Sequence, residues 1–193
     1  MYEKIYSQIT DALVDDGYIV VEDVFENSFT ENLLYRAKIE ENFKSAGISA
    51  SQNLHLDNKR RRDKIRWLDG VDEYEKEFLN FSEGLQTYLN RSLYLGLSYY
   101  EAHFAIYEKG DFYEKHFDSF KHSKNRVVTT VFYLDKCDAG ELIIYDKSGE
   151  FLKKITPQQN KLIVFMSENF PHEVLVAKSK RYSIAGWFRI DKN

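Results

Sequence analysis

The sequence predicts an α+β protein in which a mainly helical first half supports an antiparallel sheet in the second half. Apolar residues recur at helical spacing in the first half, and from Ser98 onward they alternate at every second position. Aromatic residues make up 16% of the 193 residues, which excludes a disordered chain, because such chains are poor in aromatic side chains. A chain of this length fits one domain. We therefore expect 1–193 to form a single domain with a helical part, 1–96, and a sheet part, 97–193.

Three helices are expected in the first part. The first repeats an apolar residue at every fourth position from Ile5 and ends near Gly17, a plausible C-cap. The second begins at Thr30, whose hydroxyl acts as the N-cap, and ends at about residue 43. The third covers 73 to about 93 and carries a stripe of apolar residues on one face.

The segments between these helices differ in character. Residues 18–21 predict a short strand, whereas 51–66 is polar and predicts a mobile loop or lid. The basic run 59–62 is interpreted as a solvated part of that loop, with the steering of an acidic partner as the alternative.

Seven short strands are expected in the second part, separated by turn signals such as those at 109–111, 139–140 and 147–149. Strands after helices indicate an antiparallel sandwich or barrel, and the helices need this sheet to bury their apolar stripes. The predicted strands are 99–108, 126–134, 141–146, 150–155, 160–166, 172–176 and 180–190.

Charge and cysteine content exclude several classes of protein. The net charge is −4, from 27 basic and 31 acidic residues, which argues against a general nucleic-acid binder or a binder of anionic membranes. The single cysteine, Cys137, cannot form an internal disulfide and favours a reducing cytoplasm. The sequence contains no long apolar run that would predict a membrane span and no apolar signal core at its start. We expect a cytoplasmic protein with no nucleic-acid or membrane partner.

The segment around His116 and Asp118 is the best candidate for a metal site. In an extended chain these two side chains point to the same side, so an imidazole and a carboxylate can bind one divalent metal together. His172, at the start of a late strand, is the candidate for a third ligand. Two histidines and a carboxylate occupy one face of an octahedral metal and leave three positions open, which suits Fe(II) oxygen chemistry. The remaining histidines, His55, His103 and His122, lack such partners and are interpreted as structural or exposed.

A polar face is predicted on the last strand. Alternation places Arg181, Ser183, Ala185 and Trp187 on one face, and Tyr182 and its neighbours on the other face, under the helices. An arginine inside a barrel needs an anion, and its guanidinium can bind a carboxylate through two parallel hydrogen bonds, with Ser183 adding another. The alternative is an arginine at the barrel rim that is paired with an acidic side chain.

In combination these motifs resemble the Fe(II)- and 2-oxoglutarate-dependent dioxygenases, specifically the prolyl 4-hydroxylase branch with the animal hypoxia-factor prolyl hydroxylases and their bacterial relatives. The resemblance covers about residues 60–190, and it is carried by 62–68, 107–118, 128–134, 140–142 and 171–187. It implies a double-stranded β-helix, or jelly roll, as the core. Ala185 departs from relatives that have a polar threonine at this position.

The resemblance also implies a role for individual residues. His116, Asp118 and His172 would be the iron ligands, and Arg181 would bind the distal carboxylate of 2-oxoglutarate. The other implied positions are Tyr133 and Ser183 on that carboxylate, Tyr107 and Tyr113 lining the pocket, Trp187 at the inner end of the barrel, and Asp63 and Trp67 at the substrate entrance.

The implied activity is hydroxylation of a prolyl residue in a protein or peptide, with Fe(II), 2-oxoglutarate and O₂ as cofactors, ascorbate by analogy, and succinate and CO₂ as products. A translation factor (elongation factor Tu) or a ribosomal protein is the implied partner. The alternatives are a 2-oxoglutarate oxygenase with another substrate, a cupin-like isomerase, and a non-catalytic metal-binding or oxygen-sensing module. A nucleic-acid demethylase is disfavoured by the acidic charge and by Trp187 in place of a second arginine, and a halogenase by the presence of Asp118.

Overall fold

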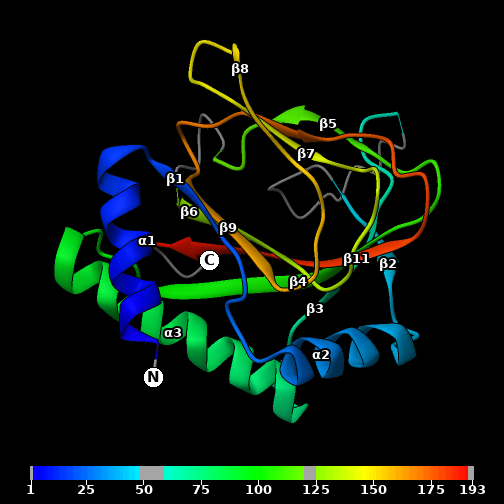
Figure 1. Ribbon diagram of the computed structural model, residues 1–193, viewed down its shortest axis with the longest axis horizontal. Coiled ribbons are helices and arrows are strands. Elements are labelled where there is room, and N and C mark those ends of the chain that lie inside the picture. Colours follow the sequence, from blue (N-terminus) through cyan, green and yellow to red (C-terminus); the bar gives the residue numbers. More distant parts are fainter. Residues whose placement is uncertain (1, 48–58, 120–124, 191–193) are drawn as a thin grey trace.

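The computed structural model describes residues 2–47, 59–119 and 125–190, and it has two antiparallel sheets with helices on one side (Figure 1). His55, His122 and residues 51–58 of the predicted loop lie outside the described residues. The helices are α1 (Glu3–Asp15), α2 (Asn27–Ile39) and α3 (Glu73–Leu93). The strands are β1 (Tyr18–Val21), β2 (Lys44–Ser45), β3 (Lys64–Trp67), β4 (Tyr99–Tyr107), β5 (Tyr113–His116), β6 (Arg126–Tyr133), β7 (Leu142–Tyr145), β8 (Phe151–Ile155), β9 (Lys161–Met166), β10 (His172–Val174) and β11 (Arg181–Arg189).

The two sheets face each other, as the predicted jelly roll requires. The larger sheet has the strand order β1-β9-β6-β11-β4-β3-β2, and the smaller has β5-β10-β7-β8. In Figure 1 the helices lie along one side of the larger sheet, and β5, β7 and β8 lie on the opposite side. The space between the sheets is therefore separated from the helices by the larger sheet.

Alternation along each strand creates two apolar layers. Between the helices and the larger sheet, Phe104, Phe132 and Ile184 pack with helix residues such as Leu33 and Phe78. Between the sheets, a second layer is built from the opposite faces of the same strands together with the smaller sheet: Tyr133, Leu142, Ile144, Ile155, Ile163, Phe165 and Phe170. A strand of the larger sheet thus contributes to both layers, because successive side chains point to opposite faces.

The start of the second helix differs from the prediction. α2 begins at Asn27 after Glu26, so Thr30 is not its N-cap. Thr30 is instead buried within the helix, on the side that carries Phe29 and Leu33. The apolar packing of this side decides where the helix begins, and the capping preference of threonine is overridden.

The predicted loop 51–66 is also wrong at its end, because its last residues form a strand. β3 pairs with β4 along its whole length. Arg66 of β3 anchors it to α3 through the fully buried carboxylate of Glu75, with Nη1 and Oε2 2.6 Å apart. Arg61 is likewise not solvated, since its guanidinium forms an ion pair with the buried Asp63. A polar sequence here encodes a strand held by buried ion pairs, which hydrophobic periodicity cannot detect.

Among the described residues, no helix has the length and apolar character needed to cross a lipid bilayer.

Gly186 marks a close approach within the larger sheet. A Cβ atom at this position would overlap the ring and hydroxyl of Tyr100, which donates or accepts a hydrogen bond with Thr130 at 2.8 Å. We expect Gly186→Ala to lower the free energy of unfolding by about 1–3 kcal/mol through overpacking. Urea denaturation measures this change. In a Tyr100→Ala background the added methyl group has space, so the two effects should not add; additive effects would contradict the packing explanation.

Candidate functional site

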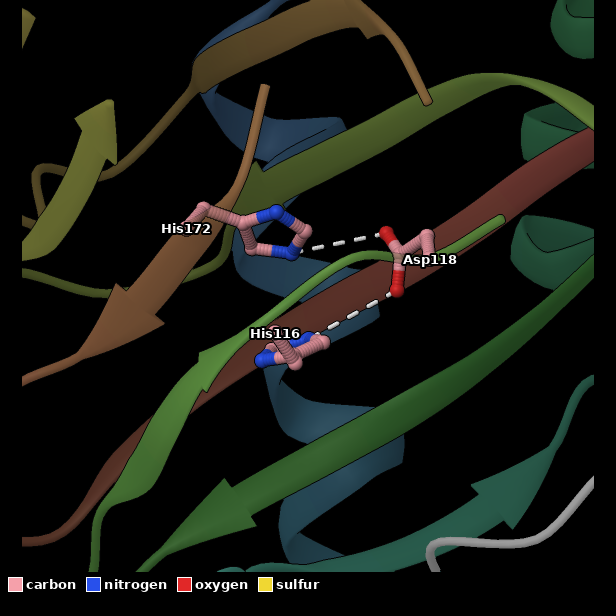
Figure 2. Close-up of side chains that lie close together, drawn as sticks. All are labelled: His116, Asp118 and His172. Carbon is pink, nitrogen blue, oxygen red and sulfur yellow. Dashed lines mark ion pairs between the residues drawn. The ribbon is translucent and has the colours of Figure 1, made fainter. Parts of the chain in front are cut away.

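Strand pairing brings the three predicted metal ligands together between the sheets (Figure 2). His172 on β10 is the direct antiparallel partner of His116 on β5, so the two imidazoles lie on the same face of the smaller sheet. Asp118 follows β5 after one intervening residue and turns toward both rings. One donor atom from each of the three side chains lies within 4.8 Å of the others, so the cluster can hold a metal ion.

Both imidazoles are oriented by the backbone. His116 Nδ1 lies 2.7 Å from the carbonyl oxygen of Glu114, and His172 Nδ1 lies 3.1 Å from that of Phe170. A carbonyl can only accept a hydrogen bond, so each neutral ring carries its proton on Nδ1 and has a free lone pair on Nε2. The two Nε2 atoms face the carboxylate of Asp118 at 3.6 and 3.4 Å, as the dashed lines in Figure 2 show. These distances exceed those of a good hydrogen bond and suit donor atoms arranged around a cation.

The charge states at this cluster also suit a metal. Burial lowers the pKa of His172 to about 4, so its imidazole is neutral at pH 7. Burial by itself would raise the pKa of Asp118, but the neighbouring His172 and His116 hold it well below its usual range. Metal ligands must be unprotonated, and the ionised Asp118 and the neutral His172 meet this requirement.

Two hydroxyl groups that sequence reasoning missed position Asp118. Thr129 on β6 donates its hydroxyl hydrogen to Asp118 Oδ2 over 2.9 Å, and its oxygen lies 2.8 Å from the hydroxyl of Ser167, which follows β9. All three residues are buried. Isolated threonines and serines carry no sequence signal for such a role, because the contact depends on how the two sheets face each other. The larger sheet therefore orients a side chain that belongs to the smaller sheet.

A buried arginine lies on the same interior face of the larger sheet. Arg181 is 1% exposed and begins β11, where it is the register partner of Tyr107. Its guanidinium lies 4.2 Å from the ring centre of Tyr107 and 5.3 Å from that of Tyr133, and Nη1 donates to Ser183 Oγ over 3.3 Å. Among the described residues, no carboxylate lies within ion-pair distance of it. The rim alternative, an arginine paired with an acidic side chain, therefore does not apply within the described chain.

The atoms around Arg181 leave hydrogen-bonding capacity for an anion. Arg181 Nε and the hydroxyl of Tyr133 are buried and have no hydrogen-bond partner in the described part of the chain. Gly140, at a φ of +72°, passes close to Arg181, and a Cβ there would lie 3.1 Å from Nε. A buried cation without a counter-charge costs several kcal/mol. The donor set of Arg181, Tyr133 and Ser183 therefore fits a carboxylate ligand.

Two tyrosines and an ion pair form the wall beside these groups. Tyr113 stacks on His116, with ring centres 3.6 Å apart, and burial raises its pKa to about 12. Tyr107 is also buried, and burial raises its pKa well above the ordinary value. Asp63 does not join the metal cluster; its carboxylate accepts two hydrogen bonds from Arg61, at 2.6 and 2.9 Å. The Arg61 guanidinium lies 4.5 Å from the ring centre of Tyr113.

The two tryptophans lie together on the interior side. Trp187 is buried, and its ring centre lies 6.3 Å from that of Trp67, whose side chain is 47% exposed at the end of β3. Arg126 lies 3.7 Å above the Trp187 ring and donates to Glu101 over 2.9 Å. Trp67 is thus the partly exposed member of an aromatic pair that leads from the surface to the interior.

His103 belongs to this group, although the sequence indicated no partner for it. Its ring centre lies 5.1 Å from that of Trp67 and 5.4 Å from that of Trp187. It is the register partner of both Trp67 and Ala185, and so its side chain is on the interior face. Alternation from the predicted interior position of Tyr107 would have placed it there, which is the one signal that the sequence contained.

One segment of the sequence matches a known protein family. Residues 102–189 match the family model of the 2OG-Fe(II) oxygenase superfamily. This segment contains His116, Asp118, His172 and Arg181. No curated protein matches the chain.

Solved structures with the same fold include several prolyl hydroxylases. The chain is similar to a prolyl 4-hydroxylase from Pseudomonas putida, with 29% identity, a TM-score of 0.86, and coverage of 97% of this chain and 100% of that one. It has the fold of a prolyl hydroxylase from Trichoplax adhaerens in complex with a peptide fragment of hypoxia inducible factor (22% identity, TM-score 0.81, 97% and 90% covered). It also has the fold of a prolyl 4-hydroxylase from Phytophthora capsici (20% identity, TM-score 0.76, 98% and 65% covered).

These findings agree with the geometry between the sheets. The matched segment supplies the two imidazoles, the carboxylate and the buried arginine. The fold of almost the whole chain is shared with the Pseudomonas putida structure. Residues 102–189 thus have the features of a 2OG-Fe(II) oxygenase domain, and prolyl 4-hydroxylases are among the structural neighbours of the chain.

Proposed function

We propose that this enzyme hydroxylates a prolyl residue of a protein or peptide substrate and converts 2-oxoglutarate to succinate and CO₂. The observation that carries the proposal is the pairing of a three-ligand cluster with a buried arginine that lacks an acidic partner in the described chain. The three-ligand cluster accommodates a divalent metal, and the buried arginine accommodates a carboxylate. A 2-oxoglutarate oxygenase needs both.

Each residue has a defined task in this proposal. His116, Asp118 and His172 would hold Fe(II) on one face, and Thr129 would keep the Asp118 carboxylate oriented. When bound, iron, 2-oxoglutarate and O₂ supply the oxidising power that inserts one oxygen atom into a substrate C–H bond and the other into succinate. Arg181 would bind the distal carboxylate of 2-oxoglutarate.

The surrounding residues complete this carboxylate site. Ser183 and Tyr133 lie beside Arg181 and supply further hydrogen-bond donors. The buried ring of Tyr107 lies against the guanidinium of Arg181 and excludes water from it, which strengthens the attraction between the guanidinium and a carboxylate.

The nature of the substrate is supported by similarity. The relative from Pseudomonas putida, a prolyl 4-hydroxylase, is matched over its whole length. A protein or peptide would approach past Trp67, the exposed member of the tryptophan pair. As the resemblance implies, a translation factor or ribosomal protein is the candidate partner class, and ascorbate is the candidate reductant.

The co-substrate site can be tested before any substrate is known. Under anaerobic conditions, Fe(II) followed by 2-oxoglutarate should produce a weak visible charge-transfer band in the wild-type protein. His116→Ala should abolish the band by removing a metal ligand, and Arg181→Ala should raise the concentration of 2-oxoglutarate required, because a buried charge pair is lost. Lys180→Ala, which removes an exposed neighbouring charge, is the matched control and should retain the band.

The outcomes separate the alternatives. Iron binding without a band would contradict the co-substrate site and favour a metal-binding module or cupin-like chemistry. A band and succinate formation, with no oxygen added to prolyl residues of peptides by mass spectrometry, would indicate a 2-oxoglutarate oxygenase with another substrate.

The hydroxyl of Thr129 should contribute to metal affinity. Thr129→Val keeps the shape of the side chain but removes the donor to Asp118, so we expect Fe(II) to bind about 10–100-fold more weakly in an anaerobic chelator competition. Thr129→Ser keeps the hydroxyl and should retain most of the affinity. Thr87→Val makes the same change on the exposed side of α3 and serves as the control. An unchanged affinity in Thr129→Val would show that Asp118 does not depend on this hydrogen bond.

A further inference from the structure

His103 is a buried polar group that the proposed chemistry does not use. It is 1% exposed, and its imidazole lies between Trp67 and Trp187 on the interior face of the larger sheet. The side chain opposite it on β11 is the small Ala185, which leaves room for the ring. A residue of this size and polarity in the wall beside the site can contact whatever enters past Trp67.

The hydrogen bonds of His103 leave one ring nitrogen free. Nδ1 lies 3.1 Å from the carbonyl oxygen of Phe104, which can only accept, so the neutral ring carries its proton on Nδ1. Nε2 is then an acceptor, and it has no hydrogen-bond partner among the residues that the structure describes. An acceptor without a partner on a largely buried side chain is a candidate contact for a ligand.

Burial, together with nearby arginines, keeps His103 neutral. Burial is the largest influence and lowers its pKa to about 3. Arg61 and Arg126 lower the pKa further, whereas Asp63 and the bond to Phe104 oppose them. The ring therefore remains an uncharged acceptor at pH 7.

A matching donor lies beside it. The indole Nε1 of Trp187 is buried and has no hydrogen-bond partner in the described chain. The ring centres of His103 and Trp187 are 5.4 Å apart. An acceptor and a donor in adjacent rings are complementary to a peptide group, which offers one N–H and one C=O.

We propose that His103 is a specificity-determining residue that accepts a hydrogen bond from a backbone N–H of the substrate, while the adjacent Trp187 indole donates to a substrate carbonyl. This inference rests on the proposed function. A prolyl nitrogen carries no hydrogen, so the N–H comes from a flanking residue, and we assign it to the residue after the proline. The pair would reject substrates that lack this N–H, because such a substrate would cover Nε2 and leave it without a partner.

The neutral state of His103 can be tested through stability. Its pKa is about 3 in the folded protein and about 6.5 in an unfolded chain, so between these pH values the unfolded state binds more protons. Stability should therefore fall as the pH decreases from 6.5 toward 4. His103→Phe keeps an aromatic ring but removes this titration, so its urea midpoint should fall less over the same range. An equal fall in both proteins would overturn the neutral acceptor.

The recognition itself can be tested with prolyl peptides. The probe is a set of short peptides, each with one proline, together with analogues in which an ester replaces the amide N–H after the proline. Wild-type, His103→Phe and His103→Gln proteins are compared by mass spectrometry of hydroxylated product. Tyr100→Phe is the matched control, because it removes a buried hydroxyl from the opposite face of the same strand.

We expect His103→Phe to raise the KM for the amide peptide about tenfold or more, because a substrate N–H is left unpaired. His103→Gln restores an acceptor near the position of Nε2 and should recover part of the affinity. Replacing the amide by the ester should raise the KM of the wild-type protein but not that of His103→Phe. Tyr100→Phe should show the same KM values as the wild type.

Each result decides a different question. An equal loss with the ester in wild-type and His103→Phe proteins would overturn the contact to Nε2. An unchanged KM in His103→Phe would overturn its role in specificity. Retention of the anaerobic 2-oxoglutarate band in His103→Phe would show that the co-substrate site is intact, so that the loss arises at the substrate. No hydroxylation of any peptide by the wild type would overturn the prolyl function and this inference with it.

Discussion

Strand β11 lies inside the larger sheet, where β4 pairs with one edge of it and β6 with the other. Because β11 is paired along both edges, alternation along it determines which face of the sheet each side chain occupies. Arg181, Ser183, Ala185 and Trp187 face the space between the sheets, and the residues between them pack under the helices. A shift of one residue in this register would turn Arg181 toward the helices, into the apolar layer, and would turn apolar residues into the space between the sheets. The register is therefore strongly specified.

The second constraint is electrostatic. Three arginines, Arg61, Arg126 and Arg181, lie over aromatic rings around the interior site. Arg61 has Asp63 as its partner and Arg126 has Glu101, but Arg181 has only the hydroxyl of Ser183 within the described chain. Since a buried guanidinium without an anion is costly, the fold retains an unfavourable arrangement there, as binding sites commonly do.

The metal cluster depends on both sheets. The smaller sheet supplies the pair of histidines through one register contact, and the turn after β5 supplies Asp118. The larger sheet supplies Thr129, and the segment after β9 supplies Ser167. Because Asp118 is oriented from the opposite sheet, the separation of the two sheets and the geometry of the ligands are coupled. This coupling gives the apolar layer between the sheets a direct influence on the site.

Much of the fold and of the site could be predicted from the sequence. Period-two alternation located the strands of the second half to within a few residues, except β5, which was not predicted as a strand. It also placed Arg181, Ser183, Trp187 and Tyr133 on the interior faces. The spacing of His116 and Asp118 and the late position of His172 predicted the cluster that the structure forms. These features are local, because backbone geometry alone sets the direction of alternate side chains.

The tertiary structure decided the features that depend on pairing and burial. β3 was hidden in a polar segment because ion pairs with α3, rather than apolar residues, hold it in place. Arg61 is held at the interior by its hydrogen bonds to the buried Asp63. Thr30 is not the N-cap of α2, because it is packed within the helix. Alternation can place Thr129 and His103 on an interior face, but their contacts with Asp118 and the two tryptophans come only from the packing of distant segments. By itself the sequence determined the chemistry and the face of each strand, whereas register and sheet packing determined which of these groups meet, since such contacts join residues far apart in the chain.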